Sequence, residues 1–153
     1  MTKKPDLSRI DVIKLNAIAS GSLNLSGVDL NGVDLSGLDF TGANFNNANL
    51  QGCNLKNAVL CNANLASTKL NHADLTCSQL ENAMICLSDL SYSNLHYANF
   101  KGANLVGSII IGANLTKANF SEADLRHVDF TDATFFDSNF DGAKLDKSRG
   151  FNV

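Results

Sequence analysis

The residues of this chain that could do chemistry are its three histidines, four cysteines and fifteen acidic residues. An active site needs acids, bases, nucleophiles or metal ligands that converge on one point. His72, His96 and His127 have no carboxylate and serine at a matching spacing, so we predict that none of them is catalytic or binds a metal. The cysteines form no C-x-x-C pair, which excludes a zinc ribbon and a thioredoxin-type motif.

The aspartates and glycines follow a regular spacing that points to structure rather than to catalysis. Asp74, Asp89 and Asp124 occupy one polar position of a short repeat, so their carboxylates do not indicate acid–base chemistry. The glycines recur at turn spacing and form no G-x-x-x-x-G-K phosphate loop. We therefore predict no catalytic residue, no metal site and no cofactor.

The repeat is five residues long. Every fifth residue from Leu25 to Leu145 is Leu, Ile or Phe, which gives 25 consecutive positions without an exception. A period of five excludes an amphipathic α-helix, whose period is 3.6 residues. From Ala43 onward the residue two before each large one is small or medium-sized, and over the whole series the residue between them is Asn or Asp in 18 of the 25 repeats. The two remaining positions vary and often contain Gly.

The repeat predicts a coil that bends in the same sense every five residues. Side chains on extended backbone alternate between two sides, so the small and large residues both point inward and the Asn or Asp points outward. The last two positions supply the bend, which suits Gly and Asn. Stacked coils bury the inward residues together. The predicted core includes Leu25, Leu30, Leu35, Phe40, Leu65, Phe100, Leu105, Phe120 and Phe140.

Units such as ADLTC, ANLQG, ANFKG, ANLVG and ANLTK resemble the A(D/N)LXX units of the pentapeptide repeat family, from Leu23 to about Leu145. The resemblance implies an all-β fold, a right-handed four-sided β-helix with 20 residues per coil. Twenty-five repeats then make about six coils, and a 20-residue spacing places four phenylalanines in one column: Phe40, Phe100, Phe120 and Phe140. We expect an N-terminal tail and capping helix over 1–21, the β-helix over 22–147 and a tail over 148–153.

Residues Leu7 to Ala19 are predicted to form the capping helix. Ser8 is the expected N-cap, with Asp11 three residues on, and Gly21 can end the helix. The expected packing face contains Ile10, Ile13, Ala17 and Ile18. Large residues occupy the small position of the first coil, either because they pack against the helix or because that coil is wider: Leu23, Val28, Val33 and Leu38.

The C-terminal end has little material to cover the last coil. Eight residues follow Leu145, and Phe151 is expected to fold over that coil. Either this end is poorly protected, or it packs against a second copy. Homodimerisation through the C-terminal coil is therefore one hypothesis.

Two groups of outward residues depart from the repeat consensus and form the candidate interaction surface. The first is apolar, as exposed interface patches often are: Met84, Cys86, Leu87, Val106, Ile109 and Ile111. The second is aromatic, with Phe136 further along: Tyr92, His96 and Tyr97. The alternatives are tolerated drift for the first group and packing of rings over adjacent turns for the second.

Composition and charge exclude several classes of protein. The net charge of −3 provides no basic face, so we predict no direct binding to nucleic acid. No apolar stretch is long enough to cross a membrane, and the N-terminus has no secretory h-region. We expect a cytoplasmic protein without membrane contact.

The predicted function is a non-enzymatic scaffold that binds a protein of unknown identity. The family resemblance implies an alternative, a DNA-mimicking modulator of DNA gyrase or another topoisomerase. This chain departs from that pattern because its charge is mild, it lacks a C-terminal helix and no loop interrupts its repeat. An enzyme would need a cleft, which a filled solenoid does not offer.

Overall fold

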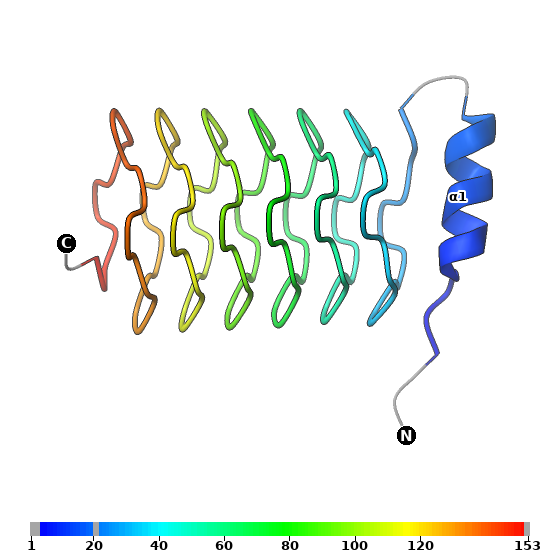
Figure 1. Cartoon of the computed structure of the whole chain (residues 1–153), viewed down its shortest axis with the longest axis horizontal. Coiled ribbons are helices and arrows are strands. Elements are labelled where there is room, and N and C mark those ends of the chain that lie inside the picture. Colours follow the sequence, from blue (N-terminus) through cyan, green and yellow to red (C-terminus); the bar gives the residue numbers. More distant parts are fainter. Residues whose placement is uncertain (1–3, 20–21, 152–153) are drawn as a thin grey trace.

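The computed structural model describes residues 4–19 and 22–151, which form a stack of coils with one helix, α1 (Arg9–Ile18), at its N-terminal end (Figure 1). Twenty-two parallel bridges each join a residue to the residue 20 positions later, from Asn24–Asn44 to Asp129–Arg149. This confirms 20 residues per coil. The last bridge joins Arg149 to Asp129 in the preceding coil. The coil therefore extends beyond position 147, into the segment 148–153 that we expected to be a tail.

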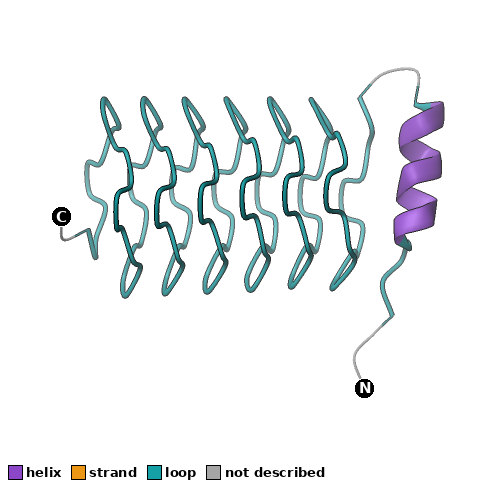
Figure 2. Ribbon diagram, in the orientation of Figure 1, coloured by secondary structure: helices purple, strands orange, loops and turns teal. Residues whose placement is uncertain are grey.

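Hydrogen bonds between coils run along the axis of the stack. The amide of Leu25 donates to the carbonyl of Asn44, and the amide of Asn44 donates to the carbonyl of Leu23, at 2.7 and 2.8 Å. The turn adds a further bond between coils, as from the amide of Gly27 to the carbonyl of Asn46 at 2.9 Å. In the described residues the coils contain isolated bridges instead of longer strands (Figure 2). Each side is too short for more, since a turn follows every three extended residues.

The turn explains the two variable positions of the repeat. The amide of Val28 donates to the carbonyl of Leu25, and Gly27 between them has a φ of 71°. A positive φ at the third residue is the pattern of a type II turn. The same position has a positive φ in all 25 repeats, and it carries Gly or Asn in about half of them.

The polar position fixes the turn from outside. The side chain of Asn24 accepts a hydrogen bond from the amide of Ser26, two residues later. The same bond forms in all 18 repeats that carry Asn or Asp there. The preference for Asn and Asp is therefore structural, as short side chains that bond nearby backbone favour turns.

The core is the filled interior of the stack. Of the predicted core residues, all but Phe140 are buried. Phe140 is only partly buried, because the last coil has no further coil to cover it. The column of rings is present: Phe100 stacks on Phe120 at 4.7 Å between ring centroids, and Phe120 stacks on Phe140 at 5.2 Å.

The helix α1 spans Arg9–Ile18 and begins with the predicted capping box between Ser8 and Asp11. Its predicted packing face is wrong. Ile10, Ile13 and Ile18 are exposed, as is Ala17. Gly21, the expected terminator, lies outside the described residues.

Val12 is the buried residue of α1, and Leu7 and Leu15 pack beside it against the core. Two polar side chains fix this orientation. Arg9 donates to the carbonyls of Asp34 and Ser36, and Asn16 donates to that of Asp39. These acceptors lie on the first coil, so the helix covers the coil edge as well as the large residues of that coil.

At the other end Phe151 packs over the last coil. Its ring lies 4.8 Å from that of Phe140 and 5.4 Å from that of Phe135, centroid to centroid. The amides of Phe135, Phe140 and Leu145 find no backbone acceptor in the described part of the chain. This end is therefore covered by one aromatic side chain and retains an unpaired edge.

Candidate interaction surface

The outer wall has four sides, which we number by the columns of polar positions that the bridges define. Side 1 carries the column of Asn24, side 2 that of Asp29, side 3 that of Asp34 and side 4 that of Asp39. A turn separates each side from the next. Backbone amides and carbonyls bond along the axis, so a partner on a side must bind mainly through side chains.

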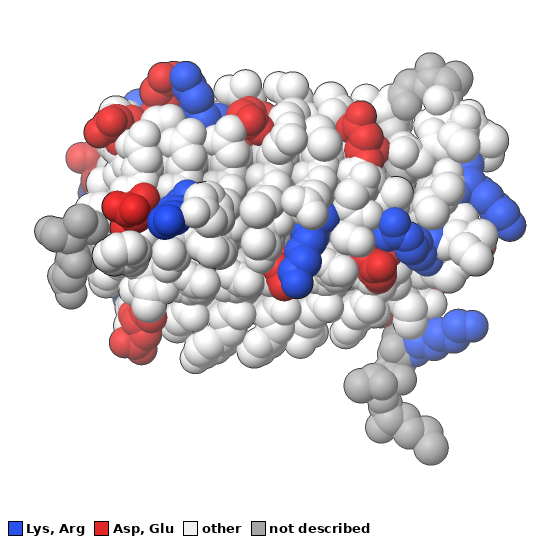
Figure 3. All heavy atoms as spheres, viewed as in Figure 1, with Lys and Arg blue, Asp and Glu red and all other residues white. Residues whose placement is uncertain are grey.

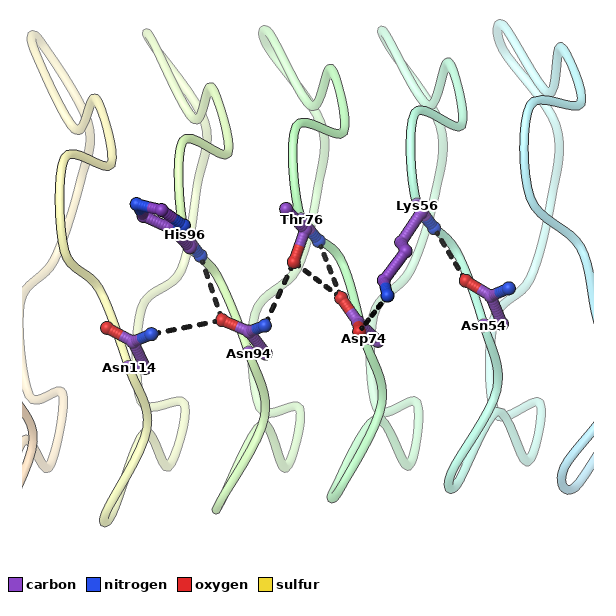
Figure 4. Close-up of polar contacts among 7 residues, drawn as sticks. All are labelled: Asn54, Lys56, Asp74, Thr76, Asn94, His96 and Asn114. Carbon is purple, nitrogen blue, oxygen red and sulfur yellow. Dashed lines mark hydrogen bonds and ion pairs between the residues drawn. The ribbon is translucent and has the colours of Figure 1, made fainter.

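Side 3 shows the wall in its ordinary form (Figure 4). Lys56 and Thr76 both contact the carboxylate of Asp74, at 3.1 and 2.6 Å. Asn94 donates to the hydroxyl of Thr76 and accepts from Asn114, at 2.9 and 3.1 Å. Burial raises the pKa of Asp74, but the hydrogen bonds from Thr76 and the charge of Lys56 outweigh it and lower the pKa overall. The polar side chains of this ladder bond to one another from coil to coil, which stabilises the stack.

Side 2 differs in its fourth and fifth coils, where apolar residues occupy one polar position and several turn positions, while Asp89 keeps the polar position of the fourth coil. Ile109 occupies the polar position between Asp89 and Asp129, and 41% of its surface is exposed. Leu87 lies on the turn at one edge of this side, 69% exposed, and Tyr92 lies on the turn at the other edge, 60% exposed.

Half-buried residues of the next coil complete this surface. The amide of Leu87 donates to the carbonyl of Val106, and that of Tyr92 donates to the carbonyl of Ile111. The structure thus brings five apolar side chains together on side 2. We call them the side 2 strip: Leu87, Tyr92, Val106, Ile109 and Ile111.

The two sequence-predicted groups are divided differently in the structure. Met84 points outward from side 1, and Cys86 is half-buried on the turn before side 2, so both border the strip. Tyr92 joins the apolar group. His96 and Tyr97 lie on the turn between sides 3 and 4, with Phe136 two coils beyond. The sequence-based groups therefore do not form two separate surfaces.

Backbone conformation is the signal that the sequence analysis missed. Leu87, Tyr92 and Tyr97 have φ values of 59°, 58° and 57°, in the left-handed region that large side chains disfavour. They occupy three successive turns of one coil at the position that usually holds Gly or Asn. All three are already candidate residues from the sequence, and comparing each residue type with the turn position would also have indicated their unfavourable backbone conformation.

Two of the histidines support aromatic rings. His72 stacks on Tyr92 at 5.4 Å between ring centroids with an interplanar angle of 11°, and His96 lies 4.4 Å from Tyr97. Lys117 donates to the hydroxyl of Tyr97 at 2.9 Å. Within residues 4–19 and 22–151, no group of three or more His, Cys, Asp or Glu side chains could hold a metal ion.

Two of the thiols, those of Cys53 and Cys61, have pKa values shifted away from the thiolate form. Burial raises the pKa of Cys53 to about 12. Burial and then the neighbouring Glu81 raise the pKa of Cys61 to about 11. A reactive cysteine needs the opposite shift, toward the thiolate.

The one helix in the described part of the chain is too short to cross a membrane.

Charged side chains are sparse over the middle of the rod and denser toward its ends on the face drawn in Figure 3. The sequence shows the same distribution, since residues 40–121 contain three acidic and four basic residues. The side 2 strip lies within this weakly charged region.

Comparisons with known proteins agree with this architecture. The chain matches the family described as pentapeptide repeats, with eight copies, over residues 24–60, 48–91, 87–121 and 113–149. Among solved structures it is similar to a pentapeptide repeat protein from the Arabidopsis thaliana thylakoid lumen. The two are 33% identical over 65% of this chain and 69% of the other, with a TM-score of 0.64. The fold is thus a right-handed quadrilateral β-helix.

Two further structures show weaker similarity. HetL of the cyanobacterium Nostoc, a pentapeptide repeat protein involved in regulating heterocyst differentiation, is 27% identical over 81% of this chain and 66% of its own, with a TM-score of 0.46. QnrB1, a plasmid-mediated fluoroquinolone resistance protein, is 23% identical over 87% of this chain and 80% of its own, with a TM-score of 0.49. No curated protein sequence matches the chain.

Proposed function

Because the chain belongs to the pentapeptide repeat family, whose members are generally non-catalytic, we propose that it is a scaffold that binds another protein through the side 2 strip. The observation that carries this proposal is the set of five apolar side chains on side 2, of which Leu87, Tyr92 and Ile109 are exposed. Contiguous exposed apolar surface of this kind marks interaction sites on soluble proteins.

The backbone cost of the strip supports the same proposal. A residue other than Gly in the left-handed region costs of order 1–2 kcal/mol, and Asn tolerates that region better. Leu87 and Tyr92 accept this cost while remaining exposed, although Asn47, Asn57 and Asn82 occupy equivalent positions. The turn requires this positive φ in every repeat but does not require a large apolar residue there, and strained residues of this kind are typical of functional positions.

A capture experiment with matched variants tests the proposal. The variant Leu87→Asn with Ile109→Asn gives both positions residues that the repeat already uses, so the rod should stay folded. Wild type and variant are used as bait in an extract of the native host, and the captured protein is identified, purified and titrated calorimetrically. We expect the variant to bind at least about tenfold more weakly, as the loss of about 1.4 kcal/mol implies.

The control for this experiment removes exposed apolar surface elsewhere. Tyr97→Asn with Phe136→Thr changes two large side chains outside the strip, and Thr already occupies the column of Phe136 at positions 76 and 116. We expect this control to bind as wild type does. Equal binding by the wild type and the strip variant would exclude the strip as the interface.

The alternative, a modulator of a topoisomerase that mimics DNA, is less well supported. Duplex DNA carries one negative charge per about 1.7 Å of its axis. The middle of this rod has three acidic residues in 82. A supercoiling assay decides, since inhibition or protection of DNA gyrase by the purified chain would favour this alternative over the scaffold.

A second contact is proposed at the C-terminal coil, with another copy of the chain. Phe135, Phe140 and Leu145 are only partly buried there, and their amides form the unpaired edge. Light scattering tests this contact, because a strict monomer at high concentration would exclude it.

The free cysteines fit our proposal of a reducing, cytoplasmic location.

A further inference from the structure

We infer that Gly107 and Gly112 are positioning residues of the side 2 strip, where they leave room for Leu87 and Tyr92 to lie against the next coil. This inference rests on the proposed function of the strip for its effect on binding. Its structural part concerns the rings and methyl groups themselves and can be tested without a partner.

The turn alone does not require glycine at these two positions. Among the described residues, sixteen other than Gly adopt a positive φ, and all sixteen occupy the same turn position. Lys117 and Glu122 do so in the same coil as Gly107 and Gly112, with φ values of 59° and 61°. A second cause must therefore be sought in what surrounds the two glycines.

Neighbouring side chains supply this cause. A β-carbon on Gly112 would lie 2.6 Å from Cε1 and 2.7 Å from Cδ1 of Tyr92, and one on Gly107 would lie 3.0 Å from Cδ2 of Leu87. Both large side chains thus lean along the axis of the rod onto the glycine one coil later.

Glycines of the early coils provide the contrast. Gly27 and Gly52 belong to the same two columns as Gly107 and Gly112, and a β-carbon on either would meet no atom within 4 Å. Gly52 and Gly112 also share a φ of 62°. The two members of this pair differ in the presence of Tyr92 and not in backbone conformation.

The result is a Tyr92 ring held on both sides. His72 stacks on one of its faces at 5.4 Å, and Gly112 lies on its other side. A side chain that is already fixed loses less conformational entropy when a partner binds, which raises affinity. Tyr97 lacks this arrangement, because the residue one coil later is Lys117, whose ammonium group lies 5.2 Å from the ring centroid.

The test compares Gly112→Ala with Gly52→Ala. Backbone strain is the same in both, since the φ values are equal, so the difference reports the contact with Tyr92. The ring protons of His72 are observed by NMR, because the stacked Tyr92 ring shifts their resonances. We expect Gly112→Ala to lose this shift and Gly52→Ala to retain it. The two variants should have similar melting temperatures, because their backbone strain is the same. A shift retained in Gly112→Ala would overturn the inference.

The effect on binding is tested by measuring the affinity of two double variants for the captured partner. The first variant is Gly107→Ala with Gly112→Ala, and the second, the control, is Gly27→Ala with Gly52→Ala. We expect the first variant to bind about threefold to tenfold more weakly than the second, the loss expected when fixed side chains become mobile. Equal affinities with a lost His72 shift would refute the positioning role. If Leu87→Asn with Ile109→Asn also binds normally, the proposed function fails, and the NMR result still decides the structural part.

Discussion

At the level of single residues, Leu87 adopts a backbone conformation that is unfavourable for leucine, and we expect this to lower the stability of the fold. Its φ is 59°, and most of its side chain is exposed. The equivalent residues Asn62 and Asn82 adopt φ values of 58° and 56°. A residue on this turn is therefore selected either for the turn or for its exposed side chain.

The single variant Leu87→Asn should be more stable than wild type. Relief of left-handed strain is worth about 0.5–1 kcal/mol, and little buried surface is lost because the side chain is exposed. Thermal denaturation measures this directly. A lower melting temperature would show that Leu87 contributes to the fold through its contact with Gly107, and the strain argument for the strip would be wrong.

Aspartates of the polar position should make stability depend on pH. A side-chain hydrogen bond from Thr41 lowers the pKa of Asp39, and one from Arg126 lowers that of Asp124. A lowered folded-state pKa stabilises the fold above the ordinary value near 3.8, and this contribution is lost as the pH falls through the folded-state pKa. Asparagine keeps the turn bond without titrating.

We therefore expect Asp39→Asn with Asp124→Asn to flatten the acid side of the stability profile. The melting temperature of wild type should fall between pH 5 and pH 2.5 by more than that of the variant. Parallel profiles would mean that these carboxylates have the same pKa in the folded and unfolded chain.

The helix α1 is the element whose packing the sequence predicted least well. Its start and its capping box follow from Ser8 and Asp11, which signal a helix start locally, and the helix itself is shorter at both ends than the predicted range from Leu7 to Ala19. Its packing face does not follow from these two residues, because apolar residues occur all around the helix and a local pattern cannot choose between Val12 and Ile13. The orientation of the helix is fixed by hydrogen bonds from Arg9 and Asn16 to carbonyl groups of the first coil, which are distant in sequence.

Substitutions on the two sides of α1 test this orientation. Val12→Ala should destabilise the protein by about 2 kcal/mol, because Val12 is fully buried between the helix and the first coil. Ile13→Ala should change stability by less than about 0.5 kcal/mol, as exposed positions do. Urea denaturation of both variants gives the two values, and a reversed order would contradict the observed packing.

At the scale of the whole molecule, the five-residue period is enough to predict the coil, the core and the polar columns. From Leu25 to Leu125 each large residue has another large residue 20 positions later, so one repeat specifies the pattern of all of them. The surface is harder to predict, since a residue's neighbours depend on the side and on the turn that it occupies. Tyr92 and Tyr97 are five residues apart in sequence, yet they lie on different edges of the rod.

The rod displays its outer side chains on a rigid wall, and the side 2 strip is the part of that wall that we propose binds a partner. Site-specific photo-cross-linking in the native host tests this most directly. Benzoylphenylalanine is introduced in place of Tyr92, on the edge of the strip, or in place of Phe136, which is 73% exposed and lies outside it. We predict a discrete cross-linked protein from position 92 and none from position 136. Adducts from position 136 alone, or equal adducts from both, would contradict the account.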